Sequence, residues 1–385
     1  MSYGMRSVAA TAGALAIVLT VGSTTPALAQ PAVGDLPSVL RGFEDAVRIG
    51  PPPAPRPIGS TAELVDALGA AQYPVGTDPA SALEVRPRPP KDVDRTAVVS
   101  TRTDGRYEYW VVDSLAMQRE VQVEVLRATT DEAAPVLYLL DGVDSPENPS
   151  GWRSEGELDT HPIVEDDVHV VIPTGAYASY WTDWESDDPV LGRIKWETFL
   201  TEELPRVVAT HLNATDQAAV GGISMGAQAA MHLAATTDLY DAVMAFSGHY
   251  STMDPLGFQT RRVTVESRGG DVENMWGPRG SERWRQNDTI SHVRGLDGKK
   301  VFFAAGNGII GPDDLAVYQD DQQAVIGGTI LELGVHEGTT AFQRALIEAG
   351  IDHRVDYAAT GLHNWSTFMA SFDAGWEYIK PALED

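Results

Sequence analysis

The 385-residue chain contains no cysteine. This absence excludes disulfide bonds, a thiolate nucleophile and any cysteine-ligated metal site. Basic residues are scarce as well: 28 Lys and Arg stand against 55 Asp and Glu, a formal net charge of −27 at neutral pH. A chain this acidic is a poor partner for phosphate backbones, so we expect no nucleic-acid binding. A hydrophobic content of 43% excludes both a disordered tail and a multi-span membrane protein.

Long apolar runs are also rare, and the clearest one lies near the N-terminus, from Val8 to Val21. Its length of about fourteen residues falls short of the roughly 20 that a membrane-spanning helix needs. Arg6 precedes the run and the small-residue string Ala27-Leu28-Ala29 follows it. This pattern predicts a secretory signal peptide over 1–29, cut after Ala29, and hence a secreted or cell-envelope protein. The alternative is a short N-terminal anchor.

Proline is concentrated in one stretch: twelve of the 24 prolines fall between residues 31 and 90. Because proline fixes φ and lacks a backbone donor, long regular elements are disfavoured there. We interpret 30–95 as a Pro-rich N-terminal extension or linker, the alternative being a small segment packed on the main domain. The folded domain is then expected over 96–385.

The pattern of apolar residues in that domain predicts an α/β fold. Two alternating segments, 107–113 and 119–127, favour antiparallel strands. Continuous apolar runs, typical of strands buried on both faces, occupy 136–140, 168–172, 218–221, 242–246, 301–305 and 355–358. Helical stretches are expected at 196–212, 225–235 and 339–349. We therefore predict the α/β-hydrolase fold: a mainly parallel sheet with flanking helices, the antiparallel pair at one edge, and 250–295 as an insertion over the active-site face.

The sharpest motif is Gly222-Ile223-Ser224-Met225-Gly226, between a predicted strand and a predicted helix. This is the context of a nucleophile elbow, in which a strained turn lifts a serine hydroxyl clear of the sheet. A side chain at either glycine would collide with neighbouring backbone. The alternative is a glycine-rich turn with an incidental serine. We predict that Ser224 is the nucleophile of a serine enzyme.

A serine nucleophile needs a histidine base and an acid, which follow it in the order serine, acid, histidine. Among nine histidines, His363 fits because it follows the last predicted strand. His353 precedes that strand, and His249 comes before any position for the acid. The acid usually follows the strand at 301–305, so on pattern alone Asp314 is slightly preferred to Glu332, although Asp314 could equally cap a helix.

The oxyanion hole needs two backbone donors. The N–H of Met225, at the start of the helix after the serine, is one candidate. The second is expected after the strand that ends in Leu140, where Asp141-Gly142-Val143 forms a turn. The N–H of Val143 is the natural donor, and Asp141 could hold the turn or simply start it.

Several strings together resemble the mycolyltransferases of the antigen 85 family, α/β hydrolases of the esterase D type, over roughly 105–380. They are Tyr138-Leu139-Leu140-Asp141-Gly142, Gly151-Trp152, Trp181-Thr182-Asp183-Trp184, Lys195-Trp196-Glu197-Thr198-Phe199-Leu200-Thr201, Gly222–Gly226, Asn274-Met275-Trp276-Gly277-Pro278, Gly306-Asn307-Gly308 and His363-Asn364-Trp365. The Trp-Glu-Thr-Phe-Leu-Thr and Asn-Met-Trp-Gly-Pro strings are far more specific than the serine motif alone.

The resemblance implies a Ser-His-Glu triad, because the family acid is a glutamate in a Leu-Glu context that matches Glu332. We therefore prefer Glu332 and keep Asp314 as the second candidate. The family's oxyanion donors map onto the backbones of Val143 and Met225. Its sugar contacts map onto Asp141 and Trp365.

Two further residues belong to the predicted substrate site. Trp152 is a candidate through the Gly151-Trp152 string. Asp144 stands where the family commonly has an arginine that contacts the trehalose sugar, and this exchange removes up to five donors and reverses the charge. Because Asp144 replaces that arginine, the resemblance does not specify which acyl acceptor the site binds at this position.

By resemblance, the chain is expected to transfer mycolyl groups from trehalose monomycolate to a second trehalose monomycolate or to cell-wall arabinan, through a ping-pong acyl-enzyme. Peripheral association with the mycolate outer layer is compatible with this activity. No cofactor is expected, and no metal-ligand spacing stands out. The alternatives are a secreted carboxylesterase with the same triad and a non-catalytic wall-binding or adhesion protein on this fold.

Overall fold

The structure is a computed structural model that describes residues 89–318 and 322–384. The predicted signal peptide and the predicted extension up to residue 88 lie outside these residues, so both stay predictions. Within the described ranges, no helix combines the length and the apolar character needed to cross a membrane.

A nine-stranded sheet forms the centre of the molecule, in the order β1-β2-β3-β5-β4-β6-β7-β8-β9. Strands β5, β4, β6, β7, β8 and β9 pair in parallel, and β1, β2 and β3 continue the sheet with antiparallel pairing. The strands are β1 Ala97–Asp104, β2 Tyr107–Ser114, β3 Arg119–Leu126, β4 Ala134–Leu140, β5 His169–Pro173, β6 Ala214–Ile223, β7 Ala242–Phe246, β8 Lys300–Ala305 and β9 Arg354–Tyr357. The predicted mainly parallel sheet with an antiparallel edge is confirmed.

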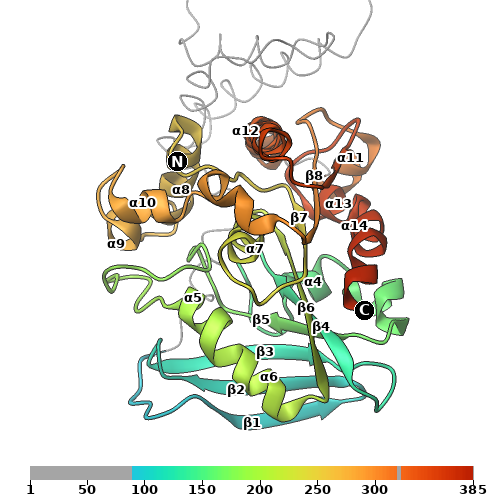
Figure 1. The fold of residues 1–385 in the computed structure, drawn as a ribbon. Helices are drawn as coiled ribbons and strands as arrows, with labels where there is room; N and C mark the ends of the chain where they lie inside the picture. The colour runs from blue at the N-terminus through green and yellow to red at the C-terminus, as the bar shows by residue number, and fades with distance from the viewer. Residues whose placement is uncertain (1–88, 319–321, 385) are drawn as a thin grey trace, which may run out of the picture.

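Helices cover both faces of the sheet (Figure 1). They are α4 Gly151–Ser154, α5 Trp196–Thr198, α6 Leu204–His211, α7 Met225–Thr236, α8 Pro255–Glu266, α9 Val272–Trp276, α10 Glu282–Gln286, α11 Pro312–Tyr318, α12 Gln322–Ala349, α13 Trp365–Ala370 and α14 Phe372–Ile379. Short 3₁₀ turns are η3 Leu158–Thr160, η4 Pro162–Glu165, η6 Thr289–Leu296 and η7 Lys380–Leu383, and one π-helical turn, η5 Phe199–Glu203, joins α5 to α6.

The continuous apolar runs supply two separate cores because successive strand residues point to opposite faces. In β4, Leu137 and Leu139 belong to the core cluster that includes residues of α4, α13 and α14, whereas Tyr138 and Leu140 belong to the one that includes residues of α5 to α10 and α12. This division explains why these strands carry no polar alternation.

Sequence reasoning placed the parallel strands and α7 within a few residues but missed several elements, among them the C-terminal helices α13 and α14. Strand β1 was not predicted, because it is largely exposed and has few apolar residues. It forms by antiparallel pairing to β2. The helix predicted over 339–349 instead begins at Gln322 and runs for 28 residues. In Figure 1, the insertion helices α8, α9 and α10 lie together at the upper left, α12 lies at the top, and β1–β3 lie at the bottom.

Candidate active site

Ser224 lies on a strained turn between β6 and α7. Its backbone has φ 52° and ψ −116°, a conformation that non-glycine residues rarely adopt. A Cβ at Gly222 would lie 2.2 Å from the carbonyl oxygen of Gly226, and one at Gly226 would lie 2.3 Å from that of Leu140. Both positions therefore require glycine, as the sequence predicted for a nucleophile elbow. The side chain of Ser224 is only partly buried.

The loop after β9 brings His363 to this serine. The Nε2 atom of His363 lies 2.8 Å from Oγ of Ser224, and its Nδ1 lies 2.7 Å from Oε2 of Glu332. With the Nδ1–H donating to the carboxylate, Nε2 can accept the hydrogen bond of the serine hydroxyl. Residues predicted from widely separated parts of the sequence thus form one continuous hydrogen-bonded chain.

Glu332 is fully buried on α12. Besides the imidazole of His363, it accepts a hydrogen bond from Oγ of Ser247 at 2.7 Å and from the backbone N–H of Gly306 at 2.6 Å, both to Oε1. Each carboxylate oxygen therefore has a donor, which satisfies a charge that would otherwise be costly to bury. The carboxylate comes from the interior of a long helix rather than from the loop after β8. The strand-and-loop rule alone therefore preferred Asp314.

The backbone around Val143 lies beside the serine. A Cβ on Gly142 would be 3.5 Å from Cβ of Ser224, and Met225 is the first residue of α7. The two predicted oxyanion donors thus belong to segments that meet at the serine. Their donor role stays a prediction because it concerns a bound oxyanion.

The loop after β5 supports these segments, a feature that sequence reasoning missed. The N–H of Ala178 donates to the carbonyl oxygen of Val143 at 2.8 Å, and the N–H of Tyr180 contacts Sδ of Met225 at 3.1 Å. The indole of Trp181 donates to the carbonyl of Asp141 at 2.9 Å. Ala178, Tyr180 and Trp181 all have φ between 51° and 55°, so strained backbone surrounds the site. The Trp-Thr-Asp-Trp string was the available signal, but it suggested no role.

Two of the predicted substrate residues are buried. Asp141 is 1% exposed, and its Oδ2 accepts from the N–H of Gly151 at 3.0 Å. Burial raises the pKa of Asp141 to about 8. Trp152 has no exposed surface and packs edge-on against the half-buried Trp365, with ring centroids 5.4 Å apart. The prediction of a substrate contact at Trp152 therefore finds no support here, because its ring supports Trp365 from the core.

Asp144 pairs with an arginine of the insertion. Nη2 of Arg268 lies 3.1 Å from Oδ1 of Asp144, and the Arg268 side chain is only 2% exposed. Burial raises the pKa of Asp144, although the charge and hydrogen bond of Arg268 oppose it. A guanidinium thus does lie next to the loop of Val143, but the segment after α8 supplies it.

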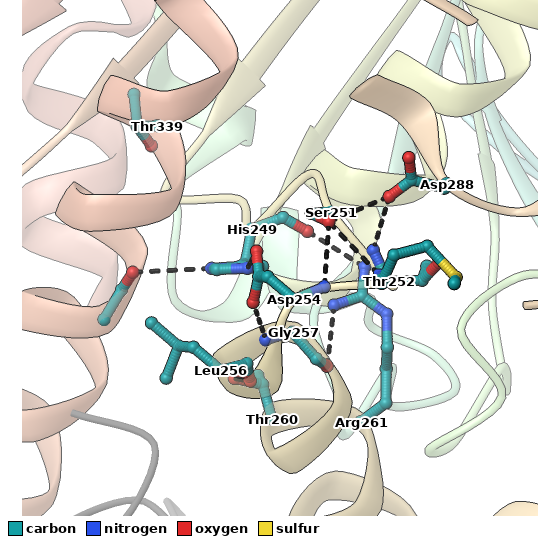
Figure 2. Close-up of polar contacts among 12 residues, drawn as sticks. His249, Ser251, Thr252, Asp254, Leu256, Gly257, Thr260, Arg261, Asp288 and Thr339 are labelled. Carbon is teal, nitrogen blue, oxygen red and sulfur yellow. Dashed lines mark hydrogen bonds and ion pairs between the residues drawn. The ribbon is translucent and has the colours of Figure 1, made fainter. Parts of the chain in front are cut away.

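The insertion is anchored to the loop that supports Glu332 (Figure 2). Nε2 of His249 lies 3.1 Å from Oδ2 of Asp254, the residue that caps α8, and Arg261 donates to the carbonyl of His249 at 2.9 Å. Ser251 donates to Asp288 at 2.9 Å. Since this loop begins with Ser247, the insertion and the buried glutamate share one support.

In the two described ranges, no group of three or more His, Asp or Glu side chains is arranged to hold a metal ion. The chemistry available to these residues is acid–base and nucleophilic: a serine hydroxyl, an imidazole that can remove its proton, and a carboxylate that can stabilise the resulting cation.

Comparison with known proteins agrees with this chemistry. The Esterase family matches residues 114–379, which is more than half of the chain. Two solved structures share its fold. The structure of MPT51 from Mycobacterium tuberculosis has a TM-score of 0.62 at 24% identity and covers 73% of this chain and 100% of its own. An S-formylglutathione hydrolase from Agrobacterium tumefaciens has a TM-score of 0.53 at 18% identity, with coverages of 74% and 99%. The fold and the site define an α/β hydrolase of the esterase class.

Sequence relatives narrow the assignment. The diacylglycerol acyltransferase/mycolyltransferase Ag85B of Mycobacterium avium is 30% identical over 307 residues, 75% of this chain and 86% of the relative. The Ag85A protein of Mycobacterium tuberculosis is 30% identical over 311 residues, with the same coverages. The chain therefore belongs to the antigen 85 family of mycolyltransferases, within the acyl-ester enzymes of the esterase class.

Proposed function

We propose that this protein is a serine acyltransferase that moves mycolyl groups from trehalose monomycolate to a second trehalose monomycolate or to another sugar hydroxyl of the cell wall. One observation carries the proposal: Ser224, His363 and Glu332 form a hydrogen-bonded chain with links of 2.8 and 2.7 Å. The relatives' names supply the acyl group, since two of them are called mycolyltransferases.

In the first half-reaction, Oγ of Ser224 attacks the ester carbonyl while Nε2 of His363 takes the hydroxyl proton. Glu332 stabilises the imidazolium, and the N–H groups of Val143 and Met225 receive the oxyanion. When the tetrahedral intermediate collapses, the ester C–O bond breaks. The imidazolium then returns the proton to the departing trehalose oxygen, which leaves a mycolyl ester on the serine.

In the second half-reaction, a sugar hydroxyl replaces the departed trehalose. His363 removes its proton, the new ester bond forms, and the serine recovers its proton as it leaves. Transfer must compete with water at about 55 M, and a positioned hydroxyl can do so because orientation is worth effective molarities of roughly 10⁵–10⁸ M. The half-buried indole of Trp365 and the Asp144–Arg268 pair are the groups we assign to positioning the acceptor.

Intact-protein mass spectrometry tests this cycle. We expect trehalose monomycolate to add one mycolyl mass to Ser224, and a chase with trehalose monomycolate or arabinan to remove it as a sugar ester. A Ser224→Ala protein that still transfers acyl groups would refute the mechanism.

The same experiment separates the main alternative, a carboxylesterase that releases acid to water. The match to the Esterase family favours this candidate, as does the carboxylate of Asp144 where the family resemblance implies an arginine. Labelling of Ser224 followed by release of free acid alone, whatever sugar is added, would establish the esterase.

We further propose that the protein acts outside the cytoplasmic membrane, from the signal-peptide pattern in residues 1–29. N-terminal sequencing of protein from the culture medium and envelope is expected to begin at Gln30. Recovery in the cytosol with residues 1–29 intact would contradict this localisation.

A further inference from the structure

A second buried carboxylate lies next to the proposed base but does not contact its ring. Asp314, in the first turn of α11, is 3% exposed. Its Oδ1 accepts from the backbone N–H of Leu362 at 3.1 Å and from Nδ2 of Asn364 at 2.7 Å. Its Oδ2 accepts from the N–H of Gly311 at 2.7 Å. The carboxylate therefore makes three hydrogen bonds inside the protein.

Two of these bonds hold the residues on either side of His363. Leu362 precedes the histidine, and Asn364 follows it and caps α13 through Thr367. The other end of α11 reaches the same loop, because the hydroxyl of Tyr318 donates to the carbonyl of His363 at 3.1 Å. The helix thus contacts the residue before the histidine, the histidine itself and the residue after it.

The loop that carries the imidazole contains Gly361 at φ +146°, a conformation that favours glycine. Glycine carries the largest backbone freedom, so external bonds must select one conformation of the loop. Hydrogen bonds to an ionised carboxylate are stronger than neutral ones and suit this task.

We propose that Asp314 is a positioning residue that sets the imidazole of His363 between Ser224 and Glu332. It acts through the backbone of Leu362 and the side chain of Asn364. The inference rests on the proposed catalytic role of His363. Misplacement of a reacting group by about 1 Å can cost about 100-fold in rate, so loss of both bonds is expected to slow acylation of the serine.

The test compares Asp314→Ala and Asp314→Asn with Asp313→Asn as the matched control. Asp313 occupies the same helical turn but is exposed. The asparagine oxygen can keep both loop bonds, while its amide group faces the N–H of Gly311. Rates are measured as Ser224 acylation by a p-nitrophenyl ester and phosphonylation by a fluorophosphonate. Neither needs a sugar acceptor, so failure of the transfer proposal would not affect the result.

We expect Asp314→Ala to lower kcat about 10- to 100-fold with little change in KM, in line with the cost of misplaced reacting groups. We expect Asp314→Asn to lose a few-fold and Asp313→Asn to match the parent protein. If the alanine variant does not fold, the asparagine variant is compared with its control alone. A kcat within two-fold of the parent for each folded Asp314 variant would overturn the proposal.

The same substitution made in His363→Ala protein distinguishes a role in positioning the imidazole from a general effect on stability. In His363→Ala protein, Asp314→Asn is expected to lower the melting temperature by the same amount as it does when His363 is present. It is expected to leave the residual phosphonylation rate unchanged. Equal fractional losses of rate with and without His363 would assign Asp314 a merely structural role and refute the inference.

Discussion

Two histidine–carboxylate pairs contact α12, and they differ in what lies at the second ring nitrogen. His363 follows β9, pairs with Glu332 through Nδ1 and has the hydroxyl of Ser224 at Nε2. His249 follows β7 and pairs with Asp254 through Nε2, while its Nδ1 faces the carbonyl oxygen of Gly334 at 3.4 Å. Only the first pair has a hydroxyl that it can deprotonate.

The supports of the two pairs differ as well. Oε1 of Glu332 is held by Ser247 and the backbone N–H of Gly306, both just after sheet strands, and Oε2 faces Nδ1 of His363. Asp254 instead caps α8, and Arg261 binds the carbonyl of His249 (Figure 2). The comparison teaches that the same two residue types can serve different ends in one chain. The His249–Asp254 pair joins a loop to a helix, whereas the His363–Glu332 pair lies beside a hydroxyl on a strained turn, as the proposed mechanism requires.

The largest expected effect is loss of the proposed nucleophile. Ser224→Ala is expected to reduce acyl transfer by about 10⁴-fold or more, as in other serine enzymes. The unfolding free energy of this variant should remain near that of the parent, because the Ser224 hydroxyl is only partly buried. Kinetics and urea unfolding measure the two quantities. Acyl transfer above one-hundredth of the parent rate would show that a group other than Ser224 is the nucleophile.

Loss of charge at the buried acid comes next. Glu332→Gln is expected to lower kcat by about 10²–10⁴-fold, because a neutral amide cannot stabilise the imidazolium. The amide nitrogen would also face the donors of Ser247 or Gly306, so the melting temperature should fall. The matched variant is Asp254→Asn in the second pair. Comparable losses of kcat in both variants would abolish the distinction between the two pairs.

Breaking the His249–Asp254 pair should act on stability rather than on rate. His249→Asn removes the imidazole that lies 3.1 Å from the carboxylate of Asp254, and we expect a loss of about 2–4 kcal/mol in unfolding free energy. The kcat of the folded protein should stay within about two-fold of the parent. A ten-fold fall in kcat with unchanged urea unfolding would instead place His249 in the reaction.

The smallest effect concerns acid stability. Burial opposes ionisation of Asp254, but the charge and hydrogen bond of His249, together with the backbone N–H of Gly257 and the charge of Arg261, outweigh it and lower its pKa to about 2. The ionised form therefore stabilises the fold above the unfolded pKa of about 4, and this contribution of roughly 2–3 kcal/mol is lost as pH falls from 4 through 2. Asp254→Asn should flatten unfolding free energy against pH in that window. An unchanged slope would show that other carboxylates dominate.

Much of this site could be predicted from the sequence because it depends on local sterics. Gly222 is required by a contact with Gly226 inside the turn itself, and the apolar runs specify strands buried on both faces. The last strand, with His363 after it, follows from the order of elements. These features involve neighbours in sequence, whose geometry the backbone constrains directly.

Only the tertiary structure decided which carboxylate meets which group. Asp314 and Glu332 are both acidic residues after β8, and their fates differ because α12 begins at Gln322 and carries Glu332 over Gly306 and Ser247. The same long-range packing placed Arg268 against Asp144 and buried Trp152. The sequence alone determined that a serine would be presented on a strained turn. Contacts between residues distant in sequence decided what surrounds it, because no local pattern encodes where separate elements converge.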